Sequence, residues 1–227
     1  MGYAILMLVL IALIFGPCIW VRRVLAKHAG PRTDFPGTGG ALARHLVEHY
    51  KLEGVTVEET ADGDHFDPIA KAVRLTRDVG EGRSLTAVVT AAHEVGHAIQ
   101  NHTGYLPLAA RTKSIGSAMR IEKIGSYALF VAPLIGGATG SPAAAILTAL
   151  GAIAIMGSSI AVHLMTLPVE FDASFNKALP ILREGGYLSE GDMPAAEEIL
   201  RACAMTYVAG SLASLLNVAR WFAILRR

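Results

Sequence analysis

The sequence has few cysteines and little net charge, and each shortage excludes a class of protein. Its two cysteines, Cys18 and Cys203, both lie in apolar stretches, so no disulfide framework is expected and neither residue is a candidate zinc ligand. A formal net charge of +1 argues against a nucleic-acid partner. The 227 residues contain no internal repeat or low-complexity segment and suit one or two domains.

Apolar residues are unusually frequent in this chain. The hydrophobic fraction of 52% and the mean hydropathy of +0.44 are high for a soluble globule, and membrane spans would account for the excess. Residues 3–21 form an uncharged run of about the ~20 residues that a transmembrane helix needs. Residues 124–138 and 143–167 form two further runs, parted by a Gly-Ser-Pro turn. The pattern predicts a transmembrane anchor followed later by a transmembrane hairpin.

The ends of these runs suggest an orientation. No basic residue precedes the first run and no small-x-small cleavage site closes it, so an uncleaved anchor is favoured over a signal peptide. Arg22, Arg23 and Lys27 follow at once, and the positive-inside rule then places residues 22–120 in the cytosol as the catalytic region. A last apolar stretch, 202–225, is either a fourth span or a helix packed along the bundle.

The segment Ala92-His93-Glu94-Val95-Gly96-His97 has the HExxH pattern. A Ser84 cap and apolar residues at helical spacing predict a helix over about 84–102, on which His93 and His97 lie one turn apart and can bind one zinc ion. Glu94 can then accept a proton from a water that zinc has activated, with no role as a ligand. The alternative is a chance occurrence of the motif on an ordinary amphipathic helix.

A catalytic zinc site usually has three protein ligands and one open position. Glu170 is the best candidate for the third ligand, because it opens a predicted helical region, 168–200, directly after an apolar run. Two predicted spans separate it from His97, and an even number returns the chain to the same side of the membrane. The alternative is a solvated glutamate at a helix start.

Other polar residues have weaker claims to a role. His163, near the end of the 143–167 run, is a rival ligand or a proton donor, although a buried histidine bonded to a carbonyl is the simpler interpretation. His45, Glu48 and His49 fit the inverted HxxEH pattern, but they follow a flexible linker and fit a solvated helix face better. Tyr207 and His163 are the candidates for stabilising the oxyanion.

Two short alternating runs precede the zinc helix. Residues 55–57 and 72–75 predict a β-hairpin, joined by turn-rich sequence. An exposed strand edge near the metal could bind an extended peptide as an added β-strand. A hairpin that merely covers a small core fits the sequence equally well.

The motifs together resemble those of the YugP-type neutral zinc metallopeptidases, bacterial membrane proteins that are distantly similar to the HtpX proteases. The resemblance covers nearly the whole chain, and its segments are the N-terminal anchor, Asp64-His65-Phe66-Asp67-Pro68, Gly82-Arg83-Ser84, Ala91-Ala92-His93-Glu94-Val95-Gly96-His97-Ala98-Ile99-Gln100, Leu167-Pro168-Val169-Glu170-Phe171-Asp172-Ala173-Ser174 and Thr206-Tyr207-Val208-Ala209. It implies a membrane-embedded gluzincin-like fold, one Zn²⁺ per chain held by His93, His97 and Glu170, and Glu94 as general base.

One departure from the wider HtpX pattern concerns the residues around the metal ligands. Those proteases carry an aspartate four residues after the glutamate ligand. This chain has Ser174 at that position, and its aspartate, Asp172, lies only two residues after Glu170. A side chain at +4 shares the ligand's helix face, whereas +2 points away. Asp172 and Ser174 are therefore both open candidates for orienting a zinc histidine or donating to the oxyanion.

The sequence thus predicts a mainly α membrane protein with three to four transmembrane helices and a small α+β zincin-like catalytic region. The expected function is a zinc endopeptidase of a bacterial cytoplasmic membrane, multi-pass, with its active site on the cytoplasmic side and the bilayer and protein or peptide substrates as partners. Two alternatives remain, a zinc-stabilised membrane scaffold that binds clients without cutting them and a zinc amidase acting on a non-protein amide.

Overall fold

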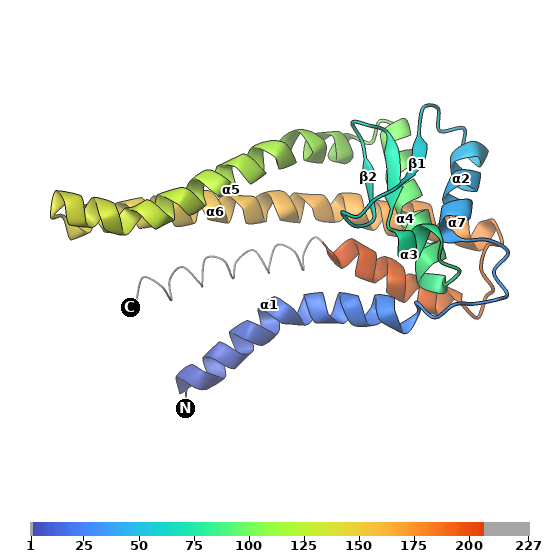
Figure 1. Ribbon diagram of the computed structural model, residues 1–227, viewed down its shortest axis with the longest axis horizontal. Helices are drawn as coiled ribbons and strands as arrows, with labels where there is room; N and C mark the ends of the chain where they lie inside the picture. Colours follow the sequence, from blue (N-terminus) through green and yellow to red (C-terminus); the bar gives the residue numbers. More distant parts are fainter. Residues whose placement is uncertain (1, 207–227) are drawn as a thin grey trace. The chain divides into compact units, whose positions relative to one another are not determined.

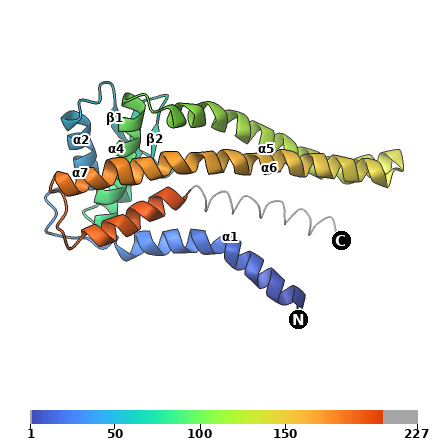
Figure 2. The ribbon, with the colours of Figure 1, turned by 180° about the vertical axis from the view of Figure 1, so that it is seen from behind.

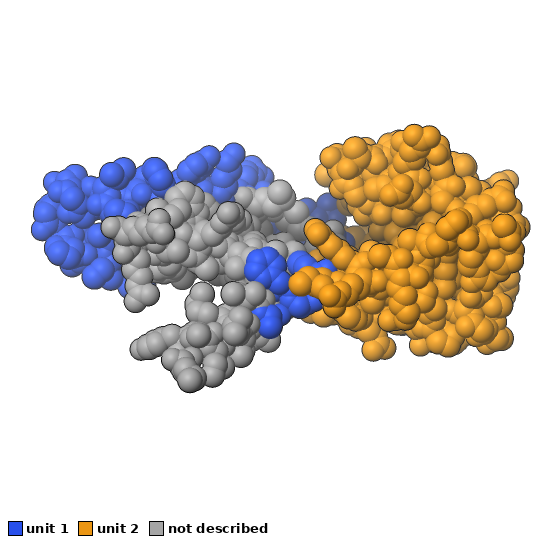
Figure 3. Space-filling model, turned by 60° about the horizontal axis from the view of Figure 1, so that its bottom comes forward, with its two compact units in different colours: residues 1–18, 110–166, 207–227 blue, residues 19–109, 167–206 orange. Residues whose placement is uncertain are grey.

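The computed structural model describes residues 2–206, and within α1, α5 and α6 it leaves some side chains, including that of His163, outside the description. The chain forms two compact units, shown in separate colours in Figure 3. Unit 1 comprises residues 1–18, 110–166 and 207–227, and unit 2 comprises residues 19–109 and 167–206.

The elements can be followed along the chain in Figure 1. Residues 193–206 are also helical. The named elements are α1 (Gly2–Lys27), α2 (Gly39–His49), β1 (Thr56–Glu59), β2 (His65–Asp67), β3 (Ala72–Leu75), α3 (Arg77–Gly80), α4 (Leu85–His102), α5 (Leu106–Thr139), α6 (Pro142–Phe171), the π-helix η1 (Asp172–Ala178) and α7 (Leu179–Glu184).

Unit 1 is built around a helical hairpin formed by α5 and α6. The two helices run side by side in both Figure 1 and Figure 2. Gly140 adopts a φ of +61° between them, a left-handed conformation that glycine reaches without strain and that reverses the chain. At Gly136 an added Cβ would come within 2.7 Å of the Ala145 Cβ, so glycine there lets the helices approach closely.

The predicted transmembrane helices are corrected by the structure. A helix that crosses a membrane needs about 20 consecutive apolar residues, and within residues 2–206 none of the described helices has the required length and apolar character. The helices also differ in extent from the apolar runs, since α5 includes Arg120 and Lys123 and α6 continues through Glu170. The expectation of three to four transmembrane helices is therefore wrong, while the mainly helical fold with a small sheet is present; most of 202–225 lies outside the described residues.

Helix α4 forms the centre of unit 2. The Ser84 hydroxyl caps its start by accepting a hydrogen bond from the Ala87 N–H at 3.1 Å. Nearly every residue of the helix is buried, because α2, η1, β2 and β3 all pack against it. Its apolar side chains join those of α2, β3 and residues 193–206 in one core, which holds the HExxH segment rigidly in place.

The sheet differs from the predicted hairpin. Its strand order is β1-β3-β2, with β1 parallel to β3 and β2 antiparallel to β3. The predicted strands are therefore parallel neighbours, and the hairpin partner of β3 is β2, which the sequence placed in the turn. The sequence does not predict strand β2, because it has only three residues and buries only Phe66. Strand β3, in the middle of the sheet, buries Val73 and Leu75.

Helix α6 continues without a break into η1 and α7. The sequence predicted a new helix opening at Pro168, but this proline lies inside α6, so Glu170 sits in the last turn of a long helix. A π-helix is rare and often marks a functional site. Here it spans Asp172 to Ala178, directly after Glu170, and packs against α4.

The close approach of α4 to η1 makes Gly96 a sensitive position. A Cβ at Gly96 would lie 2.7 Å from the carbonyl oxygen of Ala173, and a backbone atom cannot swing aside as a side chain can. We expect Gly96→Ala to lower the free energy of unfolding by about 1–3 kcal/mol, because it overpacks this contact. Thermal melts should show a fall of roughly 2–4 °C for each kcal/mol in a chain of this size.

Gly137→Ala is the matched control for this substitution. Gly137 is also helical, but an added Cβ there meets no described atom within 4 Å. The control should melt at or slightly above the wild-type temperature, because alanine favours a helix over glycine. Equal melting temperatures for Gly96→Ala and wild type would show that η1 can move away at no cost.

Candidate metal centre

Three buried side chains from two helices meet in unit 2. His93 and His97 lie one turn apart on α4, and Glu170 comes from the last turn of α6. Their exposed fractions are only 3%, 5% and 1%, and one ligand atom from each lies within 4.8 Å of the others. Among the residues that the structure describes, these three form the group of His, Cys, Asp and Glu side chains that could hold a metal ion.

The spacing of the donor atoms fits a tetrahedral zinc site. Glu170 Oε2 lies 3.2 Å from His97 Nε2 and 3.3 Å from His93 Nε2. Two ligands bound at 2.0–2.1 Å on a tetrahedral ion are about 3.3–3.4 Å apart, which agrees with both distances. Two imidazoles and one carboxylate are also a donor set typical of catalytic zinc, in which the fourth position is left open.

The surroundings keep Glu170 ionised, as a metal ligand must be. Burial alone would raise the pKa of this carboxyl group, but the charges and hydrogen bonds of His97 and His93 outweigh it and hold the pKa well below its usual range. Glu170 therefore does not have to release a proton before it binds a cation.

The far side of each histidine ring is also engaged. Ser174 Oγ lies 3.0 Å from His93 Nδ1 and 3.1 Å from the carbonyl oxygen of Leu200. Since the carbonyl can only accept, the hydroxyl donates to Leu200 and accepts from the Nδ1–H of His93. His97 Nδ1 lies 2.9 Å from Gln100 Oε1 and donates to it. Both rings thus carry a proton at Nδ1, and the Nε2 atom of each faces Glu170.

The other residues singled out from the sequence are distributed as follows. Glu94 is on α4 with only 6% of its surface exposed, next to His93 in the chain. Ser174 contacts His93 directly, whereas Asp172 contacts no ligand ring and instead accepts a hydrogen bond from Gln100 Nε2 at 2.8 Å. The His163 side chain and Tyr207 lie outside the described part of the chain.

Gln100 is a buried residue of the site that sequence reasoning missed. It lies three residues after His97, and side chains at this spacing share a helix face. That spacing was the available signal, but an amide is neither a usual zinc ligand nor titratable, so it did not stand out.

The rival HxxEH segment does not assemble a metal site in the described structure. His45, Glu48 and His49 are all exposed on α2, and no third ligand joins the two histidines. His45 Nε2 instead shares a hydrogen bond of 2.8 Å with the hydroxyl of Tyr187. The exposure of the three side chains agrees with the solvated helix face that the sequence favours for this segment.

Cys203 lies near the metal centre but is not part of the group. Its side chain is buried, and this burial, together with the charge of Glu94, raises the pKa of the thiol far above its usual range. A protonated thiol is a poor zinc ligand. Among the described residues neither Cys203 nor Cys18 joins the metal group.

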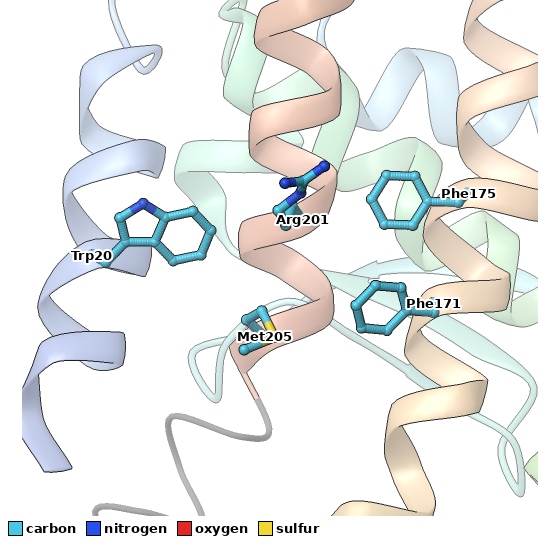
Figure 4. A pocket seen from close by; sticks show the side chains of 5 residues that line it. All are labelled: Trp20, Phe171, Phe175, Arg201 and Met205. Atoms are coloured by element: carbon cyan, nitrogen blue, oxygen red, sulfur yellow. The ribbon is translucent and has the colours of Figure 1, made fainter. Parts of the chain in front are cut away.

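A separate apolar cavity opens beside residues 193–206 in unit 2. Its volume is about 470 Å³, and Figure 4 shows the side chains that line it, which are Trp20, Phe171, Phe175, Arg201 and Met205. None of the three candidate ligands lines it. Phe171 follows Glu170 in the chain, so consecutive residues of one helix face two different sites.

Comparisons with known proteins agree with this chemistry. Residues 3–226 match the protein family described as "Putative neutral zinc metallopeptidase". The chain is also 33% identical over 207 residues to the "Putative membrane protease YugP" of Bacillus subtilis (strain 168). The matched region covers 90% of this chain and 88% of the relative. No solved structure matches the chain. The family resemblance drawn from the sequence motifs is confirmed.

Proposed function

Since this chain belongs to the neutral zinc metallopeptidase family, we propose that it is a zinc-dependent endopeptidase that cleaves protein substrates. The observation that carries the proposal is the convergence of His93, His97 and Glu170 in a buried site, with the carboxylate of Glu94 beside the first of them in the chain. A purely structural zinc site has a closed set of four ligands and needs no such carboxylate.

We assign the metal site to the three convergent side chains, which would hold one Zn²⁺ per chain. When bound, zinc would lower the pKa of water to about 7 and polarise the carbonyl group of the scissile bond. The chain itself contributes a preformed site, because both imidazoles are held through Nδ1 with Nε2 facing Glu170, and Glu170 presents a carboxylate.

We assign proton transfer to Glu94. Its carboxylate would take the proton of the attacking water and later give a proton to the leaving amine, as a general base and then a general acid. Ser174 would hold the His93 ring through its hydrogen bond to Nδ1. For the oxyanion we keep the two donors proposed from the sequence, His163 and Tyr207, whose side chains lie outside the described ones.

The sheet offers a way to bind an extended substrate. Strand β2 is an outer strand of the described sheet and packs against α4, the helix that carries the two histidines. We propose that a peptide adds to β2 through main-chain hydrogen bonds, which give affinity with little dependence on sequence. The Bacillus subtilis relative is named "Putative membrane protease YugP", and we propose that this chain also associates with a membrane.

Metal analysis combined with a cleavage assay tests the proposed function. We expect the purified full-length chain to contain about one zinc per molecule and to cleave an unfolded protein substrate. A chelator should abolish cleavage, and added zinc should restore it, because the ligand set is compatible with reversible binding.

Each alternative function gives a different result in this assay. Stoichiometric zinc without cleavage of any unfolded protein would favour the scaffold. Hydrolysis of a lipid or cell-wall amide, with unfolded proteins left intact, would favour the amidase. Full cleavage by metal-free protein would overturn zinc dependence.

A further inference from the structure

The side chain of Gln100 uses all of its hydrogen-bonding groups inside the site. It is 0% exposed, and its Oε1 accepts from His97 Nδ1 at 2.9 Å. Its Nε2 donates to the carbonyl oxygen of Val169 at 2.8 Å and to Oδ2 of Asp172 at 2.8 Å. An amide nitrogen carries two hydrogens, so both donors are in use. Gln100 therefore joins α4, the end of α6 and the start of η1.

The partners of Gln100 permit one orientation of its amide. Turning the group by 180° would exchange its oxygen and nitrogen. The oxygen would then face the carboxyl group of Asp172 and the carbonyl oxygen of Val169, and a carbonyl oxygen can only accept a hydrogen bond. Val169 and Asp172 thus fix the oxygen against His97, and this oxygen accepts only from a ring protonated at Nδ1.

From this geometry we infer that Gln100 is a positioning residue for the metal centre. It keeps the proton of His97 on Nδ1 and sets the orientation of the ring, so that Nε2 faces Glu170 and would be free to bind the metal. Asp172, which lies two residues after Glu170 and contacts no ligand ring, acts on the site through Gln100. This inference rests on the proposed zinc site.

Gln100→Met tests the inference, because methionine has a similar length and volume but offers only a weakly accepting thioether to His97 and no donor to Val169 or Asp172. We expect the affinity for zinc to fall by about 10- to 100-fold, the usual cost of losing a partner that orients a zinc histidine. The full-length variant would be titrated with zinc in competition with a chromophoric chelator. The visible spectrum of the Co²⁺-loaded protein would report a change in ligand geometry.

Thr86→Val is the matched control for a loss of structure alone. Thr86 is also buried on α4, and its hydroxyl donates to the carbonyl oxygen of Leu25 at 2.7 Å. Removing this hydroxyl should lower the melting temperature but leave the zinc affinity and the Co²⁺ spectrum unchanged. A fall in zinc affinity equal to that of Gln100→Met would show that any buried polar loss on α4 has the same effect, against the inference.

A pair of substitutions offers a rescue that a merely structural role would not give. Gln100→Glu alone places a carboxylate against both Asp172 and the carbonyl oxygen of Val169 and should weaken zinc binding. Adding Asp172→Asn removes the first of these two repulsions by supplying an amide donor, keeps the local charge of wild type and again presents an oxygen to His97. We expect the double variant to bind zinc at least about 10-fold more tightly than Gln100→Glu alone, if the restored partner recovers the low end of the loss.

The outcomes separate this inference from the proposed function. Zinc binding at wild-type affinity by a folded Gln100→Met variant, or no recovery in the double variant, would overturn the role of Gln100 and leave the zinc peptidase proposal standing. Failure of the wild-type chain to bind zinc at all would overturn both.

Discussion

Replacing Glu94 with glutamine is expected to reduce cleavage of an unfolded protein by a factor of about 10² or more, the usual share of general acid–base catalysis. Glutamine has the shape of glutamate but cannot accept the proton of the attacking water. Glu94 is not one of the three convergent ligands, so the variant should keep its zinc. Initial cleavage rates and zinc content would be measured on the same preparation.

Glu48→Gln is the matched control for Glu94→Gln. Glu48 is the glutamate of the HxxEH segment on α2, where it is exposed and has no convergent metal ligands among the described residues. This control should cleave at the wild-type rate. Unchanged cleavage by Glu94→Gln would refute the general base, and a loss in Glu48→Gln instead would move the active site to α2.

The α4 helix could be predicted because its signals are local. The Ser84 cap, the apolar spacing and the i, i+4 histidines all depend on residues within a few turns of one another, and the observed helix, Leu85–His102, differs little from the predicted 84–102. Glu170 lies 73 residues after His97 in the sequence, so no local pattern predicts that it meets the two histidines. It could be proposed only because zinc chemistry requires a third ligand.

The sheet and the transmembrane helices could not be predicted in the same way. Strand pairing is decided by contacts across the sheet, so two apolar runs indicated strands but not that β2 would pair with β3 on its other side. The apolar runs likewise indicated helices but not their extent, and α5 and α6 both include polar residues beyond the runs. Composition alone therefore gave too many spans.

The environment of the ligands was hidden by the π-helix. The positions of Asp172 and Ser174 were judged on α-helical spacing, but both lie in η1, where hydrogen bonds run from i to i+5 and the spacing of faces changes. Ser174 contacts His93, the ligand on the other helix, and Asp172 is linked to His97 through Gln100. The neutral amide of Gln100, which lies between a histidine and an aspartate, has no signature in a search for titratable residues.

Removal of the Glu170 carboxylate should have the largest effect on metal binding. If the roughly 10–16 kcal/mol of a four-ligand zinc site is shared evenly, one ligand contributes about 10²- to 10³-fold in affinity. We expect Glu170→Ala to lose this much zinc affinity, measured by chelator competition. Glu190→Ala is the control, because Glu190 is exposed and outside the metal group, and it should bind zinc as the wild type does.

A cavity in place of Glu170 could also weaken binding by loosening the site, since this side chain is 1% exposed. Glu170→Gln separates the two causes, because it preserves volume and removes only the charge. If both variants lose zinc, the carboxylate itself is the ligand; if only Glu170→Ala does, its role is packing. Retention of wild-type affinity in both variants would refute Glu170 as a ligand and direct the search to His163, the rival from the sequence, whose replacement by alanine should then release the metal.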